Sequence, residues 1–297
     1  MLAGAIDIGG TSTKIGVVAD DGSIVARERI ATSLRGEPTP LVAGIGAAFR
    51  ALLARNEALR DIVGVGVSVA GFVTADHSAM VHNANLPALR EFPLKTALED
   101  RLGFQCRLEV DSNATTLAEF HYGAGKGVRR LLGLTIGTGI GGGVILDGKL
   151  VRYTGECAGD LGHVIVKPGG RLCTCGAHGC LEAMANSSAL SERVGGRSVK
   201  DIIDAASRGD DTARNAIAES GYWIGLGLAS LAALFDPDTI VIGGGIAAAR
   251  HFLLDAVRES YLEHASPQYR DARVQGSDFD GWDGLAGAAS LFLAPVP

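Results

Sequence analysis

The sequence lacks an apolar run long enough to cross a membrane. Its longest such run, IGLGLASLAALF at 224–235, has 12 residues, whereas a membrane-spanning helix needs ~20. A signal peptide is not expected either, because the chain starts without a basic region and Asp7 soon interrupts its first apolar stretch. We therefore expect a cytoplasmic protein with no membrane partner, in which 224–235 belong to a buried helix.

The sequence also lacks the positive charge of a nucleic-acid-binding protein. Its formal net charge is -6 over 297 residues, so neither nucleic acid nor an anionic membrane surface is an expected partner. Disulfides are not expected, since a chain that is not exported stays in a reducing compartment and its five cysteines are an odd number. The length is sufficient for two domains with a large core.

The first part of the chain alternates strands and helices after three opening strands. Apolar runs separated by turn residues predict antiparallel hairpins at 3–8, 15–19 and 23–30. Apolar residues at helical spacing predict helices at 40–60, 93–103 and 113–123. Continuous apolar runs predict strands at 62–73 and 106–110.

The same pattern begins again at 131–151 with a strand, a glycine turn, a strand, an Asp-Gly turn and a third strand. A strand at 239–245 runs into three glycines, and helices are predicted at 186–194, 199–207, 211–234, 249–262 and 282–293. The repeat predicts an α/β fold of two related halves, each opened by a glycine hairpin.

Both glycine turns carry the chemistry of phosphate binding. Glycine lets backbone N–H groups converge on an anion, and threonine hydroxyls add donors. Neither DIGGTSTKIG (7–16) nor LTIGTGIGGG (134–143) is a GxxxxGK(S/T) loop, and neither leads into the helix of a GxGxxG turn. A tight hairpin is the alternative for either turn alone. Two such turns, with VIGGG at 241–245, favour a nucleoside triphosphate held between two domains.

Three of the five cysteines lie in the eight residues CTCGAHGC, 173–180. With His163 upstream, Cys173, Cys175 and Cys180 form a complete Cys₃His set for tetrahedral zinc. His178 is a rival ligand, and unliganded core cysteines are the other alternative. A redox role fits less well, because the spacing is CxC rather than CxxC. For Cys106 and Cys157, outside this set, core packing is the better interpretation.

The three glycine motifs, in this order, resemble the phosphate and adenosine motifs of the actin-like ATPase and sugar-kinase superfamily. The segment GECAGDLGHVIVKPGGRLCTCGAHGCLE (155–182) resembles the signature of the ROK family of repressors, open reading frames and sugar kinases. The resemblance implies two ribonuclease H-like (actin/hexokinase-type) α/β domains flanking a cleft. The expected domains are 1–113 plus 285–297 and a larger domain, 114–284, that carries the zinc loop.

The resemblance further implies an ATP- and Mg²⁺-dependent hexose kinase that phosphorylates the sugar 6-hydroxyl, with a structural zinc and a homodimeric assembly. In EVDSNATTLAEF (109–120), Asp111 aligns with the catalytic base of the family, and the alternative for Asp111 is a helix N-cap. The residues expected to contact the sugar are Gly71, Asn85, Asp111, Asp160, His163 and Glu182. Those expected to bind ATP and its phosphates are Asp7, Gly9, Gly10, Thr11, Lys14, Thr135, Gly137, Thr138, Gly139, Gly243, Gly244 and Gly245.

Two positions depart from the glucose-type pattern of the family. Val110 stands where an asparagine usually precedes the catalytic aspartate, and Asp160 replaces the glutamate of GExGH. Glucokinase activity remains the first expectation. The alternative is an amino or N-acetylated hexose, such as glucosamine, kanosamine, N-acetylmannosamine or N-acetylglucosamine. A ROK transcriptional regulator is a remote alternative, since ROK repressors carry a helix-turn-helix domain before the first glycine turn, whereas this turn begins at residue 7 and the net charge is negative. A polyphosphate donor is disfavoured by the intact VIGGG.

Overall fold

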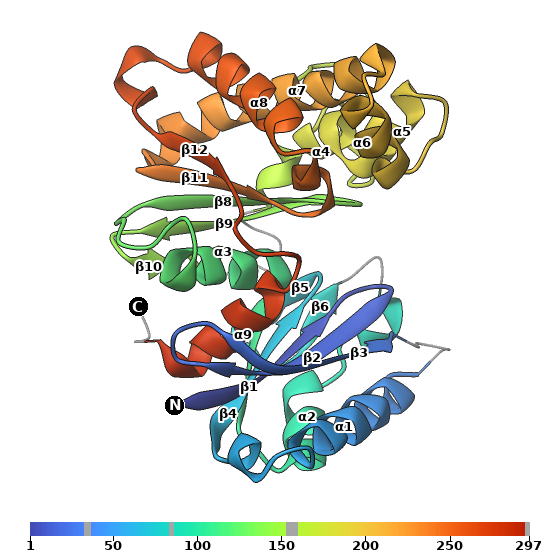
Figure 1. Ribbon diagram of the computed structural model, residues 1–297, viewed down its shortest axis with the longest axis vertical. Coiled ribbons are helices and arrows are strands. Elements are labelled where there is room, and N and C mark those ends of the chain that lie inside the picture. The colour runs from blue at the N-terminus through green and yellow to red at the C-terminus, as the bar shows by residue number, and fades with distance from the viewer. Residues whose placement is uncertain (33–36, 83–85, 153–159, 295–297) are drawn as a thin grey trace. The chain divides into compact units, whose positions relative to one another are not determined.

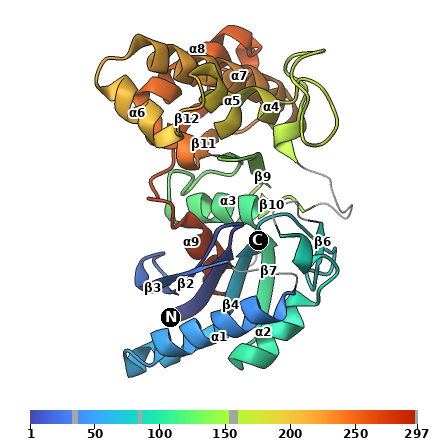
Figure 2. The same ribbon diagram turned by 90° about the vertical axis from the view of Figure 1, so that its right-hand side faces the viewer.

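The computed structural model describes residues 1–32, 37–82, 86–152 and 160–294. The chain divides into two compact units. The first unit comprises Met1–Lys126, Leu150–Gly159 and Phe279–Pro297, and the second comprises Gly127–Lys149 and Asp160–Asp278. A five-stranded sheet is the centre of each unit (Figures 1 and 2).

The order of strands and helices includes both glycine hairpins predicted from the sequence. The strands are β1 (Leu2–Ile8), β2 (Ser12–Ala19), β3 (Ile24–Ala31), β4 (Ile62–Val69), β5 (Phe72–Val73), β6 (Met80–His82), β7 (Cys106–Val110), β8 (Leu131–Ile136), β9 (Ile140–Leu146), β10 (Lys149–Leu150), β11 (Thr239–Gly243) and β12 (Arg273–Gly276). The helices are α1 (Thr39–Leu53), α2 (Leu94–Leu102), α3 (Asp111–Tyr122), α4 (Leu181–Ala185), α5 (Ser187–Arg193), α6 (Val199–Ser207), α7 (Asp211–Phe235), α8 (His251–His264) and α9 (Asp283–Leu293). Short 3-10 helices are η1 (Glu57–Arg60), η2 (Pro87–Leu89), η3 (Leu161–His163), η4 (Gly245–Ala249) and η5 (Pro267–Tyr269).

The two sheets have the same topology. The strand order is β3-β2-β1-β4-β7 in the first and β10-β9-β8-β11-β12 in the second. In each, the first strand pairs antiparallel with the next strand of its hairpin and parallel with a strand that follows a crossover. The sequence repeat therefore corresponds to a structural repeat, and the predicted α/β class is confirmed.

The alternation of side chains along β1 separates two cores. Ile6 and Ile8 belong to the core under α1 and α2, whereas the smaller Ala3 and Ala5 belong to the core under α9. Figure 1 shows these helices on opposite faces of the sheet. The small residues allow a close approach of α9. A Cβ on Gly66 of β4 would lie 1.8 Å from the Ala288 carbonyl oxygen, so only glycine fits there.

Helices α4 to α8 lie on one face of the second sheet (Figure 1). The 25 residues of α7 make it, by length and composition alone, a helix that could cross a membrane. However, 56% of its most apolar window is buried inside the protein. Gly225 lets α8 approach so closely that a Cβ there would lie 2.5 Å from the Val257 carbonyl oxygen. This packing agrees with the prediction of a buried helix around 224–235.

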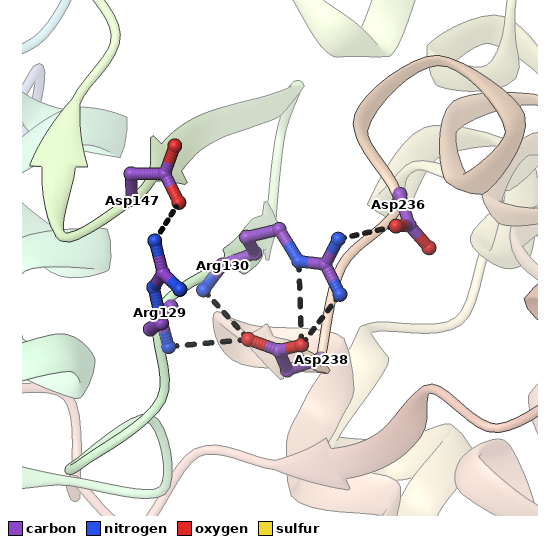
Figure 3. A network of polar contacts seen from close by, with 5 residues as sticks. All are labelled: Arg129, Arg130, Asp147, Asp236 and Asp238. Carbon is purple, nitrogen blue, oxygen red and sulfur yellow. Dashed lines mark hydrogen bonds and ion pairs between the residues drawn. The ribbon is translucent and has the colours of Figure 1, made fainter.

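Asp238, in the segment before β11, forms hydrogen bonds with the residues just before β8 (Figure 3). Asp238 Oδ2 accepts hydrogen bonds from the Arg129 and Arg130 backbone N–H groups at 3.1 and 2.9 Å, and Oδ1 accepts from Arg130 Nη2 at 2.8 Å. Arg130 also pairs with Asp236, and Arg129 Nη2 donates to Asp147 Oδ1 at 2.7 Å. Burial raises the pKa of Asp238, but the hydrogen bonds from Arg130 and Arg129 outweigh it and leave that pKa below its ordinary value.

Several expected elements differ in extent. The strand predicted at 62–73 ends at Val69, because the chain turns at Gly71, which has a φ of 103°. The helix predicted at 186–194 is present as α5, whereas the short helix α4, which ends just before it, was not predicted. Strand β12 was not predicted, since only Val274 of its four residues is buried and no apolar run marks it.

The expected domain boundary at 113/114 falls inside α3. In the structure, α3 belongs entirely to the first unit, because it packs on α9. The contact is close, and a Cβ on Gly287 of α9 would lie 1.7 Å from the Ala114 carbonyl oxygen. The C-terminal return to the first unit begins at Phe279 rather than at residue 285.

Candidate active site

The first glycine turn joins β1 to β2 and carries a charged pair at its base. Asp7 and Lys14 are cross-strand partners, and Lys14 Nζ donates to Asp7 Oδ2 at 2.8 Å. Ser68, on the neighbouring parallel strand β4, donates to Asp7 Oδ1 at 2.9 Å. The Asp7 side chain is only 14% exposed. The turn residues Gly9, Gly10 and Thr11 follow directly, so the structure brings the predicted members of this motif together.

A second carboxylate, not predicted from the sequence, lies near this pair. Asp283 is the first residue of α9, and a Cβ on the following Gly284 would lie 2.6 Å from Asp7 Cγ. Burial raises the pKa of Asp283 above its ordinary value, the Asp7 charge raises it further, and Lys14 partly opposes them. Two carboxylates and one ammonium group therefore share the end of β1.

The predicted base, Asp111, is the first residue of α3. Val110 occupies the N-cap position without a side-chain cap, and Asp111 Oδ1 accepts from Ser112 N at 2.8 Å. Asp111 therefore lies one position inside the helix and does not act as its N-cap. An anionic side chain in the first turn is favoured by the helix dipole, which supports an ionised carboxylate.

The buried carboxylate of Glu109, in β7, stabilises the start of α3. Glu109 is 1% exposed and forms an ion pair with Arg152, whose Nε donates to Glu109 Oε2 at 2.9 Å. Glu109 Oε1 accepts from Asn113 Nδ2 at 2.9 Å and from Val110 N at 3.1 Å. The Asn113 contact ties β7 to the first turn of α3, and the Arg152 contact ties β7 to the segment after β10. The position of Asp111 is thus fixed by a buried network.

The other sugar-site residues predicted in the first unit are Gly71 and Asn85. Gly71 lies in the turn between β4 and β5 with a positive φ, a conformation that favours glycine. Asn85 lies outside the described residues. Cys106 is fully buried in the core, as expected, and burial raises its pKa to about 12, whereas Cys157 is also outside the described residues.

The second glycine turn and the predicted adenosine motif lie side by side at the carboxyl ends of two neighbouring strands of the second sheet. Strands β8 and β11 are parallel neighbours, and Thr135 pairs with Gly243. The turn Gly137–Gly139 continues β8 and is closed by a hydrogen bond from Gly137 N to Gly139 O at 2.9 Å. Gly244 follows β11 with a φ of 88°, and a Cβ on it would lie 2.3 Å from the Ile136 carbonyl oxygen. Gly245 then begins η4.

His163 and the three cysteines of the predicted set form one cluster in the second unit. Their four ligand atoms lie within 4.8 Å of one another. Cys173 Sγ is 3.5 Å from His163 Nδ1, and Cys175 Sγ is 3.6 Å from Cys180 Sγ. Tetrahedral zinc, with Zn–S near 2.3 Å and Zn–N near 2.05 Å, requires separations of about 3.6 Å for a sulfur–nitrogen pair and about 3.8 Å for two sulfurs. The donor set therefore fits zinc in both chemistry and size.

His178, the rival ligand, lies outside this cluster. Its Nδ1 is within hydrogen-bond distance, 3.0 Å, of the Gly170 carbonyl oxygen. The other nitrogen of His163, Nε2, is 3.3 Å from Asp160 Oδ2. A carboxylate on the free nitrogen is the usual way to orient a metal-bound imidazole. Burial raises the pKa of Asp160, His163 opposes that shift, and the nearby Glu182 adds to it.

Glu182 connects the cysteine loop with the second glycine turn. Its Oε1 accepts from Thr174 Oγ1 at 3.0 Å, and its Oε2 accepts from Ile140 N at 2.9 Å. A Cβ on Gly139 would lie 2.6 Å from Glu182 Oε2, so the turn passes directly over the carboxylate. The predicted zinc, sugar and phosphate residues of the second unit are therefore parts of one hydrogen-bonded structure.

Comparison with known proteins agrees with this geometry. The model of a family described as the ROK family matches residues 3–294. The chain belongs to the ROK family. It is 34% identical over 316 aligned positions to a glucokinase of Streptomyces coelicolor, with 98% of each chain covered. It is 31% identical over 292 positions to an N-acetylmannosamine kinase of Salmonella typhi, with 97% of each covered.

The fold of a ROK protein of known structure superposes on the whole chain. A ROK family glucokinase from Streptomyces griseus, crystallised with glucose and AMPPNP, superposes with a TM-score of 0.85 and 33% sequence identity. The match covers 98% of this chain and 99% of that one. The predictions of a ROK chain and of an actin/hexokinase-type two-domain fold are therefore confirmed.

Proposed function

We propose that this ROK chain is an ATP-dependent hexose kinase that phosphorylates the sugar 6-hydroxyl, with glucose as the first candidate substrate. The observation that carries this proposal is the repeated glycine turn. Each turn follows the first strand of a sheet with the same topology, and one of them stands beside Gly243–Gly245 at the end of a parallel strand. Turns of this kind present backbone N–H groups that suit the phosphates of a nucleotide.

Asp111 is the proposed base. Its carboxylate takes the proton of the sugar 6-hydroxyl while that oxygen forms a bond to the γ-phosphorus of ATP and the bond to ADP breaks. The products are the sugar 6-phosphate, ADP and one proton. An ionised Asp111, favoured by its place in the first turn of α3, is the form that accepts this proton.

Mg²⁺ is the proposed cofactor of ATP, and Asp7 is the residue that would hold it. Each Asp7 oxygen accepts one hydrogen bond, from Lys14 or Ser68, and retains a lone pair for a Mg²⁺-bound water. When bound, the ion neutralises charge on the phosphates. Lys14 would contribute a second positive charge on the same side of the first turn.

A structural zinc is proposed at His163, Cys173, Cys175 and Cys180. The zinc would contribute folding energy to the loop that carries Thr174 and leads into Glu182. Its proposed role is to hold the sugar residues Asp160, His163 and Glu182 in place. Cys173, Cys175 and Cys180 are free of disulfides, so their sulfurs are available as thiolate ligands, and a cytoplasmic location would keep them reduced.

Two residues, Val110 and Asp160, bear on which sugar the enzyme phosphorylates. Val110 offers no hydrogen bond to a sugar hydroxyl, and the Asp160 carboxylate lies against His163. A buried polar group left unpaired costs ~1–3 kcal/mol, so such differences discriminate strongly between sugars. An amino or N-acetylated hexose is the second candidate, favoured by these two positions and by the relationship to the Salmonella typhi N-acetylmannosamine kinase.

The deciding experiment is ATP-dependent phosphorylation of a sugar panel: glucose, mannose, allose, glucosamine, 3-amino-3-deoxyglucose (kanosamine), N-acetylglucosamine and N-acetylmannosamine. A kcat/KM for glucose at or above every other sugar supports a glucokinase. A clear preference for another sugar makes Val110 and Asp160 the specificity residues. No phosphorylation of any sugar by zinc-loaded protein with Mg²⁺ and ATP would overturn the proposal.

We also propose a homodimer that binds neither nucleic acid nor membrane. Tyr222 and Leu234 of α7 and Leu262 of α8 are large apolar side chains exposed on the second unit. Burial of these side chains in a dimer is favourable. Light scattering of the wild type and of Leu234→Glu, which places a charge on this surface, tests the assembly.

A further inference from the structure

Carbonyl oxygens of the second glycine turn accept hydrogen bonds from residues at the start of α5. The Ser187 backbone N–H donates to Gly137 O at 2.9 Å, and Asn186 Nδ2 donates to Thr138 O at 3.0 Å. Asn186 is itself fixed, because its Oδ1 accepts from Ala189 N at 2.8 Å and so caps α5. One asparagine therefore uses its acceptor on a helix and its donor on the turn.

The first glycine turn is held in the same way by a different residue. Thr32 Oγ1 donates to Gly9 O at 2.7 Å, and Thr32 N donates to Thr11 O at 3.0 Å. Since the Thr32 hydroxyl proton is used on Gly9, the 2.8 Å contact with Thr13 Oγ1 has Thr13 as the donor. Thr13 is fully buried in β2. Each turn thus has one polar side chain, Thr32 or Asn186, that donates to a carbonyl oxygen of the turn and is itself held by a second hydrogen bond.

These contacts determine where the amide hydrogens of the turns point. In a planar trans peptide, the C=O and N–H groups point in opposite directions. With Gly137 O and Thr138 O directed at α5, the N–H groups of Thr138 and Gly139 point away from it. In the first turn, the Gly10 N–H points away from Thr32 for the same reason. Converging amide hydrogens are the donor set that a phosphate requires, whereas carbonyl oxygens in their place would repel it.

We propose that Thr32 and Asn186 are positioning residues for the phosphates of the nucleotide. The side chain of each donates to a carbonyl oxygen of its glycine turn and keeps the amide hydrogens directed at the phosphate. Neither side chain needs to touch the nucleotide, and their effect is confined to its phosphates. This inference rests on the proposed function of the chain as an ATP-dependent kinase.

The sharpest variant is Asn186→Asp. An aspartate keeps the acceptor that caps α5, because Asp and Asn are equally good N-caps. It replaces the amide donor with a carboxylate oxygen facing Thr138 O. We expect the Kd of AMPPNP, measured calorimetrically with Mg²⁺, to rise by at least about tenfold. Asn186→Ser keeps a cap and replaces the amide donor with a shorter hydroxyl without adding charge, and should give a smaller rise in the same direction. Thr32→Val, which removes the hydroxyl from a side chain of similar shape, should also raise this Kd.

The readout that separates positioning from structural damage is adenosine, which has no phosphate. Its Kd should stay within about twofold of the wild type in all three variants, as should the Kd of the sugar. The matched control is Asn56→Asp, the same substitution at the N-cap of η1, where Asn56 Oδ1 accepts from Ala58 N. This control should leave the AMPPNP Kd unchanged.

The outcomes distinguish the two proposals. Absence of AMPPNP binding to the wild type would overturn the proposed kinase function itself. Wild-type binding together with an unchanged AMPPNP Kd in Asn186→Asp, Asn186→Ser and Thr32→Val would overturn the positioning role alone. An equal loss of adenosine and AMPPNP affinity would also overturn it, since the effect would then not be specific to phosphate.

Discussion

Replacement of Arg152 by methionine should destabilise the first unit by about 3 kcal/mol, because it leaves the buried Glu109 carboxylate without its cationic partner. Glu109 is 1% exposed and accepts hydrogen bonds from Arg152, Asn113 and Val110. Removal of one partner of a buried ion pair costs about 3–5 kcal/mol. Arg152 is itself 36% exposed, so water can reach the vacated side and the lower end of this range applies.

The two tryptophans make the measurement specific to one unit. Trp282 belongs to the first unit and Trp223 to the second. In a Trp223→Phe background, urea unfolding followed by Trp282 fluorescence therefore reports on the first unit, and the change in its free energy of unfolding is read from the midpoint at constant slope.

A double-mutant cycle tests whether the pair itself is responsible. Glu109→Gln removes the charge, so Arg152→Met in that background leaves no buried carboxylate and should cost at least 1 kcal/mol less, roughly, than it does beside Glu109. A loss below about 1 kcal/mol for Arg152→Met alone, or strict additivity in the cycle, would refute the reasoning, because both results mean that Glu109 does not depend on Arg152.

Three further perturbations have defined outcomes. Asp111→Asn should lower kcat by about 10²–10⁴-fold with no change in nucleotide Kd. The control is Asp100→Asn, which changes an exposed aspartate of α2 and should leave kcat unchanged. An Asp111 variant that keeps more than about a tenth of kcat would contradict the role of Asp111 as the base. Cys175→Ser should lose zinc, measured by elemental analysis, together with sugar affinity, and full zinc occupancy with unchanged sugar binding would speak against the zinc loop as a support of the sugar site. Asp238→Asn should lower the free energy of unfolding by about 1–2 kcal/mol at neutral pH, since it weakens the bonds to Arg130. Because the folded pKa of Asp238 is lowered, the difference from wild type should persist above about pH 4–5 and shrink as the pH falls below the unfolded value near 3.9, and a pH-independent difference would contradict the pKa shift.

Features that are local in sequence could be predicted. The glycine hairpins combine apolar runs with turn residues a few positions apart, and both appear as β1-β2 and β8-β9. The cysteine cluster is equally local, because three of its four ligands fall within 173–180. The start of α5 is local too, since Asn186, a strong N-cap residue, stands directly before its first residue.

Features that depend on chain crossings could not be predicted. Arg152 and Glu109 are 43 positions apart, and Thr32 and Gly9 are 23 apart, so no periodicity or motif connects them. Ser68 reaches Asp7 only because β4 returns parallel to β1 in one particular register. Strand β12 depends on β11 for its pairing, and its own residues carry little hydrophobic signal. The sheet must form before these partners can meet.

Helix α9 gives the chain a definite order of assembly during synthesis on the ribosome. It completes the first unit, where Gly287 meets Ala114 and Ala288 meets Gly66, yet it is translated after every element of the second unit. Until α9 emerges, the Ala3 and Ala5 face of β1 has no cover. A nascent chain that stops before α9 would leave this face of β1 uncovered and would expose an apolar surface to chaperones and proteases.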